Sequence, residues 1–167
     1  MAVIWSRRET EPERLSYFTQ LLDGVWVEDE DVVFDPAAET VTVSFEQAPG
    51  ADLEERPEFS NGGRTLIRET AWFDEYKRPT VRCSLVVHEA LGMTIEDPEL
   101  NLLFEVEYSE ADRRIELRCD PAGRPVEIPV RRVDVELRMT DEIVGWERFR
   151  VGRGIGWESV APWRDEA

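Results

Sequence analysis

The 167-residue chain has one histidine and two cysteines, and these shortages exclude two classes of site. A catalytic triad or a cysteine–histidine pair would have to use His88. Strand alternation places His88 on the face opposite Cys83, so we interpret it as a surface or edge-strand residue and expect no catalytic residues. One histidine and two separated cysteines also cannot form a zinc site of the usual four-ligand kind. We therefore expect no metal and no cofactor.

Long apolar runs are also missing. The first residues contain no apolar core of the secretory kind, and no segment approaches membrane-spanning length. Cys83 and Cys119 fall on apolar faces of expected strands, where buried free thiols are common. A disulfide between them is open as an alternative, but two core thiols in a reducing compartment fit better, and this predicts a cytoplasmic protein.

Positive charge is scarce, since 37 acidic residues face 20 basic ones for a net charge of −17. Such a charge disfavours binding to nucleic acids and anionic membranes, and it favours a basic protein partner. The charge is uneven along the chain. Residues 1–112 hold 26 acids and 9 basic residues, whereas residues 113–153 hold 8 acids and 10 arginines. Most acidic clusters read as solvated turns.

Residues 11–23 are the one segment with helical spacing. Thr10 is the expected N-cap, Pro12 and Glu13 complete a helix-start pattern, and Gly24 stands where the helix should stop. The apolar residues then recur at three- and four-residue steps: Leu15, Phe18, Leu21 and Leu22. The pattern predicts one short amphipathic helix whose apolar stripe packs on a sheet.

From Gly24 onward the apolar residues alternate with period two, which predicts strands. A turn is expected at Asp74–Arg78 and a long loop at residues 48–63. The alternation slips at Arg131–Arg132, which we interpret as a β-bulge. The expected strands are Gly24–Glu28, Val32–Asp35, Thr40–Gln47, Arg64–Phe73, Pro79–Glu89, Leu100–Ser109, Arg114–Asp120 and Val126–Thr140.

Together these elements predict a mainly β fold. We expect an antiparallel β-sandwich or open β-barrel with one N-terminal amphipathic helix at about residues 11–23. The chain shows no internal repeat and no convincing linker, so we expect a single domain over residues 1–167. Gly152–Gly156 is read as a tight turn, because too few residues follow it to complete a phosphate-binding unit.

Residues 145–157 have the most individual composition in the chain. Aromatic residues and arginines alternate there, and arginine beside aromatic rings is frequent at binding surfaces. The alternative is that the rings belong to the core while the arginines offset neighbouring acids. The candidate binding residues are Trp146, Arg148, Phe149, Arg150, Arg153 and Trp157.

Three hypotheses for the function follow. The leading one is a non-catalytic, acidic protein-interaction module that binds a basic protein, with an inhibitor, an immunity-type protein or a DNA mimic as versions. The second is an enzyme or small-ligand-binding protein with its site in a barrel or sandwich cleft. The third is a structural subunit of a larger assembly, with Trp5, Trp26 and Trp163 as candidate contact residues.

Overall fold

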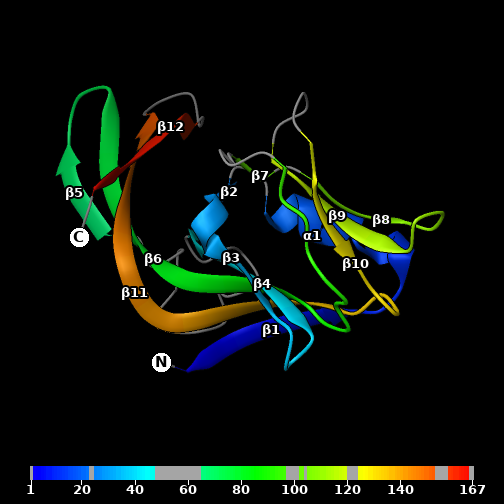
Figure 1. Cartoon of the computed structure of the whole chain (residues 1–167). Helices are drawn as coiled ribbons and strands as arrows, with labels where there is room; N and C mark the ends of the chain where they lie inside the picture. Colours follow the sequence, from blue (N-terminus) through cyan, green and yellow to red (C-terminus); the bar gives the residue numbers. More distant parts are fainter. Residues whose placement is uncertain are drawn as a thin grey trace. The chain divides into compact units, whose positions relative to one another are not determined.

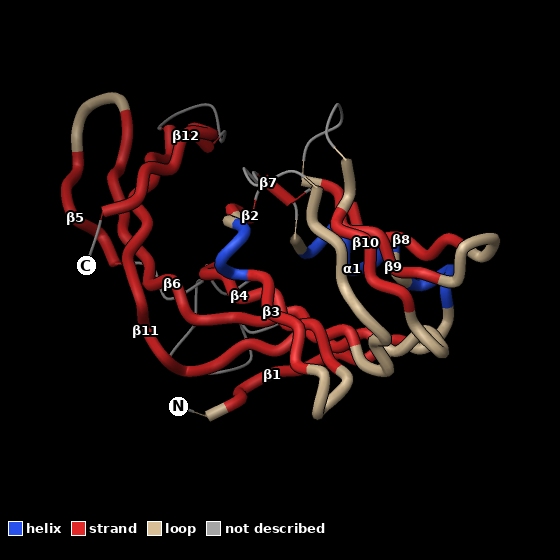
Figure 2. Tube along the Cα trace, viewed as in Figure 1, coloured by secondary structure: helices blue, strands red, loops and turns tan. Residues whose placement is uncertain are grey.

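Strands dominate the protein in a computed structural model, which describes residues 2–22, 25–47, 65–96, 102–103, 105–119, 124–152 and 158–165 (Figures 1 and 2). Its one α-helix is α1 (Ser16–Leu21), and short 3₁₀ turns lie at Pro12–Arg14 and Asp29–Asp31. The strands are β1 (Val3–Glu9), β2 (Val25–Trp26), β3 (Val32–Asp35), β4 (Thr40–Gln47), β5 (Thr65–Glu69), β6 (Phe73–Val87), β7 (Leu102–Leu103), β8 (Glu105–Ser109), β9 (Arg114–Arg118), β10 (Val126–Pro129), β11 (Val135–Gly152) and β12 (Glu158–Asp165).

The strands form two main antiparallel sheets. The larger has the order β1-β11-β6-β4-β3, with β12 paired to β11 and β5 paired to β6. The smaller has the order β10-β9-β8, and β2 pairs separately with β7. The prediction of a mainly β, antiparallel fold with one N-terminal helix is confirmed, and the described residues form no closed barrel.

The chain divides into two compact units made of interleaved segments. The first unit contains Met1–Ala2, Glu46–Arg82 and Thr140–Ala167, and the second contains Val3–Phe45 and Cys83–Met139. Two long strands, β6 and β11, contribute residues to both units. Among the described residues, no helix is long and apolar enough to span a membrane.

Buried residues of the second unit come from the helix and from both sheets. The predicted inward faces are confirmed for the strands in which alternation was clearest, because a sheet covered on one side buries every second residue. These buried residues include Val41, Val43 and Phe45 of β4, Ile115 and Leu117 of β9, Val126 and Ile128 of β10, and Val135 and Leu137 of β11. Cys83 and Cys119 are buried and form no disulfide.

The helix is shorter than the predicted residues 11–23. Glu11, rather than Thr10, precedes the first turn, and its side chain makes no capping hydrogen bond. Pro12 begins a 3₁₀ turn and α1 follows only from Ser16. Leu15, Phe18 and Leu22 are fully buried as predicted, whereas Leu21, the fourth residue of the predicted stripe, is half-buried.

The turn predicted at Asp74–Arg78 is wrong, because these residues lie within β6. The hairpin instead turns at Thr70–Trp72. The Thr70 hydroxyl donates to the Phe73 carbonyl at 2.7 Å and accepts from the Phe73 amide at 3.0 Å. Across the hairpin, Arg68 pairs with buried Glu75 at 2.5 Å, so a charged run can continue as a strand.

The bulge predicted at Arg131–Arg132 is also wrong. β10 ends at Pro129 in the small sheet, and β11 begins at Val135 in the large one. The two apolar phases therefore belong to two strands of different sheets, not to one distorted strand. The connecting residues are tied to the preceding chain by the Arg131 amide, which donates to the Glu89 carbonyl at 3.1 Å.

Other parts of the described chain cover both edges of the small sheet. The Thr19 hydroxyl of α1 bonds to both backbone groups of Val106 in β8. On the opposite edge, Thr94 exchanges two backbone hydrogen bonds with Glu127 of β10. These contacts occupy backbone groups of one residue at each edge of the small sheet.

Candidate functional sites

His88 lies in a chain of hydrogen-bonded side chains in the second unit. Its Nε2 is 3.0 Å from Oε2 of Glu136, and the same carboxylate oxygen accepts from Arg138 at 2.9 Å. The hydrogen bond from Arg138, and then that from His88, lowers the pKa of Glu136. These contacts join Glu136 and Arg138 of β11 to His88, which directly follows β6.

Asp134 lies next to this group and is 3% exposed. Arg8 of β1 donates to both of its carboxylate oxygens at 2.6 Å, and these hydrogen bonds lower the pKa of Asp134. The His88 amide also donates to the Asp134 carbonyl at 2.8 Å. The single histidine thus lies beside two hydrogen-bonded carboxylates, Glu136 and Asp134, and their arginines. Within the described residues, no group of three or more His, Cys, Asp or Glu side chains could hold a metal ion.

The predicted aromatic–arginine segment lies on β11 in the first unit, and it splits between the two faces of the sheet. Phe149 is buried and stacks on Tyr76 of β6, with ring centroids 5.6 Å apart. The guanidinium of Arg78 covers Phe149 at 5.0 Å and also pairs with Glu147. Phe149 therefore belongs to the packing of this face.

Trp146, Arg148 and Arg150 share the other face and are half-buried. Lys77 of β6 lies 4.7 Å above the Trp146 ring, and Arg150 lies 4.4 Å above the ring of Phe73. Arg68 approaches Phe73 at 5.5 Å. Cation–π contacts at such distances stabilise a packed layer. A binding role for this segment stays a prediction, and Arg153 and Trp157 lie outside the described residues.

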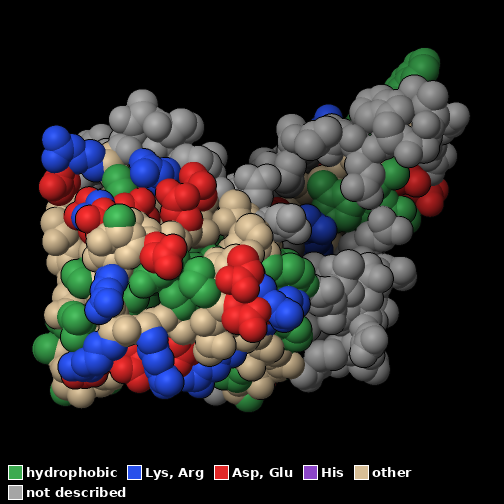
Figure 3. All heavy atoms as spheres, turned by 90° about the vertical axis from the view of Figure 1, so that its right-hand side faces the viewer, with side chains coloured by type: hydrophobic (Ala, Val, Ile, Leu, Met, Phe, Trp, Pro, Cys, Tyr) green, Lys and Arg blue, Asp and Glu red, His purple; other side chains and the backbone are tan. Residues whose placement is uncertain are grey.

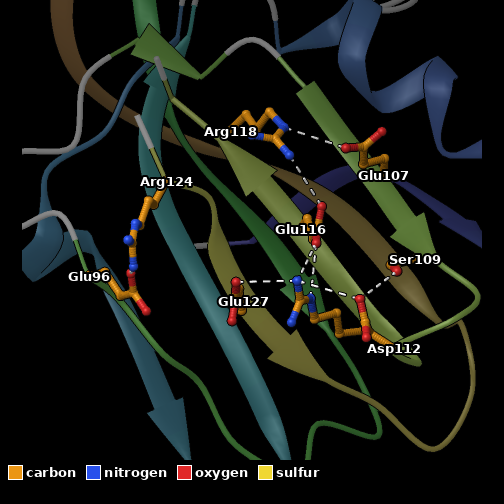
Figure 4. Close-up of polar contacts among 9 residues, drawn as sticks. Glu96, Glu107, Ser109, Asp112, Glu116, Arg118, Arg124 and Glu127 are labelled. Carbon is orange, nitrogen blue, oxygen red and sulfur yellow. Dashed lines mark hydrogen bonds and ion pairs between the residues drawn. The ribbon is translucent and has the colours of Figure 1, made fainter. Parts of the chain in front are cut away.

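A row of three glutamates crosses the small sheet. Glu107 of β8 stands directly opposite Glu116 of β9, which stands directly opposite Glu127 of β10. Directly opposed residues of a sheet point to the same face, and like charges in that position repel. We call Glu107, Glu116 and Glu127 the carboxylate row (Figure 4).

Two arginines of β9 hold the carboxylate row in place. Arg118 lies 3.5 Å from both Glu107 and Glu116, whereas Arg114 reaches Glu116 at 2.9 Å and Glu127 at 3.3 Å. Glu116 is buried between them at 8% exposure. Seen from the side of these strands, acidic and basic side chains are interspersed with apolar ones (Figure 3).

Glu105 extends the carboxylate row at the β8 edge. Burial, and then the neighbouring charge of Glu107, raises the pKa of Glu105. Asp112 lies at the other end of the hairpin, 3.6 Å from Arg114. Five carboxylates on this face thus share two arginines: Glu105, Glu107, Asp112, Glu116 and Glu127.

Sequence reasoning missed the carboxylate row and the partners of the aromatic–arginine segment. The row depends on the register of three strands, which alternation alone does not reveal. Once Asp74–Arg78 is read as strand, alternation places Phe73 and Lys77 on one face of β6 and Tyr76 on the other; the pairing of β6 with β11 comes from the structure.

Comparison of the chain with protein-family models, curated proteins and solved structures gave no match. The structure alone describes the chain: it is a mainly β protein with two antiparallel sheets, one short helix and an acidic face on the smaller sheet.

Proposed function

We propose that the protein is a non-catalytic interaction module that binds a basic protein, as an inhibitor or immunity-type protein does. The observation that carries this proposal is the carboxylate row together with Glu105 and Asp112. Five carboxylates on one face share two arginines, so the face has room for cations supplied by a partner.

The net negative charge of the protein also supports a positively charged partner. The described residues of the second unit include 19 acidic residues and 10 arginines, and the whole chain carries −17. A field of one sign raises the rate at which an oppositely charged protein associates, and salt screens the effect. The partner should therefore associate quickly at low salt and more slowly at physiological salt.

The local geometry indicates where the partner's cations would bind. Glu105 and Glu107 have side-chain exposures of 38% and 42%, whereas Glu116 is enclosed by Arg114 and Arg118. Burial first, and then the neighbouring charge of Glu107, raises the pKa of Glu105. A lysine or arginine placed between Glu105 and Glu107 would relieve that repulsion, since opposite charges favour the ionised carboxylate.

The buried, unbridged Cys83 and Cys119 support our proposal of a cytoplasmic location, because a reducing compartment preserves free thiols.

The test combines partner capture with kinetics. The wild-type chain and a Glu105→Gln/Glu107→Gln variant are used to capture proteins from the source organism's lysate at low and physiological salt. Association rates with the captured protein are then measured. A Glu11→Gln/Glu13→Gln variant is the control, because it removes the same charge at exposed positions outside the sheet.

We expect the sheet variant to bind at least about tenfold more weakly than the control variant, since charge-assisted contacts are lost at the edge of β8. Equal loss in both variants would assign the effect to net charge alone. A partner with a net negative charge, or no specific partner at either salt, would contradict the proposal.

A further inference from the structure

We draw no further inference here: the strongest candidate, the apolar surface that Leu66, Ile67 and Trp72 expose on the β5–β6 hairpin of the first unit, carries none, because nothing in the described part of the chain shows what covers it.

Discussion

The Thr19 hydroxyl of α1 satisfies both backbone groups of Val106 in β8: it accepts from the Val106 amide at 3.0 Å and donates to the Val106 carbonyl at 3.4 Å. Thr19→Val keeps the shape of the side chain but removes both bonds. We expect a loss of about 1–3 kcal/mol in the free energy of unfolding, because a backbone donor and acceptor lose their partner. Urea unfolding measures the loss, and Thr19→Ser, which retains the hydroxyl, should lose less. Equal stability of Thr19→Val and the wild type would contradict this role.

The Arg8–Asp134 pair should make stability depend on pH in the acid range. The folded state lowers the pKa of Asp134, chiefly through the hydrogen bond from Arg8. Stabilisation from a lowered pKa is present above the unfolded value, about 4, and is lost as pH falls through the folded value. Glu136, whose pKa is also lowered, acts in the same direction.

We therefore expect Asp134→Asn to be less stable than the wild type at pH 7, and to lose less stability than the wild type between about pH 5 and pH 2. Arg8→Met should cost about 1–3 kcal/mol at pH 7, because it leaves the buried Asp134 carboxylate without its two donors. Denaturant unfolding across pH measures both effects. Parallel pH profiles for wild type and Asp134→Asn would show that the pair contributes no linkage.

Gly145 lies where a side chain would collide with its neighbours. A Cβ atom there would be 2.8 Å from Oγ1 of Thr80 and 3.1 Å from Oε2 of Glu46. Thr80 is β-branched and 1% exposed, so it cannot easily move aside. We expect Gly145→Ala to destabilise the protein by about 1–3 kcal/mol, as overpacking does. The control is Gly92→Ala, since nothing lies within 4 Å of a Cβ atom at Gly92. Thermal unfolding of both variants gives the comparison, and equal stability of the two would contradict the close approach.

Phe149 and Trp146 should respond differently to truncation. Phe149→Ala removes a buried ring that stacks on Tyr76, and we expect a cost of about 2–4 kcal/mol. Trp146→Ala removes a half-buried ring beneath Lys77, and the cost should be smaller. Urea unfolding measures both costs. A larger cost for Trp146→Ala would show that the packed face is the one that carries Trp146.

Alternation predicted the fold most reliably where one face of a strand is buried and the other is exposed. Val41, Val43 and Phe45 of β4 are the clearest case, and all three are buried as predicted. It was least reliable where charges occupy a strand. Asp74–Arg78 resembles a turn by composition. In the structure, however, Arg68 pairs with Glu75 across the hairpin, and Glu147 of the distant strand β11 pairs with Arg78. These partners make the strand possible.

The candidate sites were predictable only in part for a related reason. The aromatic–arginine segment is visible in the sequence because its residues are close together in the chain. Only the structure of β11 and its neighbours shows that Phe149 and Trp146 lie on opposite faces with different partners. Glu107, Glu116 and Glu127 are nine and eleven residues apart and look unrelated until three strands are placed in register.

The amino-acid sequence by itself determined the net charge, the antiparallel β character and the apolar stripe of the helix. It also showed that the two cysteines do not have the spacing of metal ligands. These properties follow from composition and from the spacing of apolar residues, because the geometry of a single strand or helix fixes which residues share a face. The tertiary structure alone decided which charges meet: Arg8 with Asp134, His88 with Glu136, and the three glutamates of the carboxylate row with Arg114 and Arg118. Those meetings depend on strand order and register, which are set by packing between residues far apart in the chain.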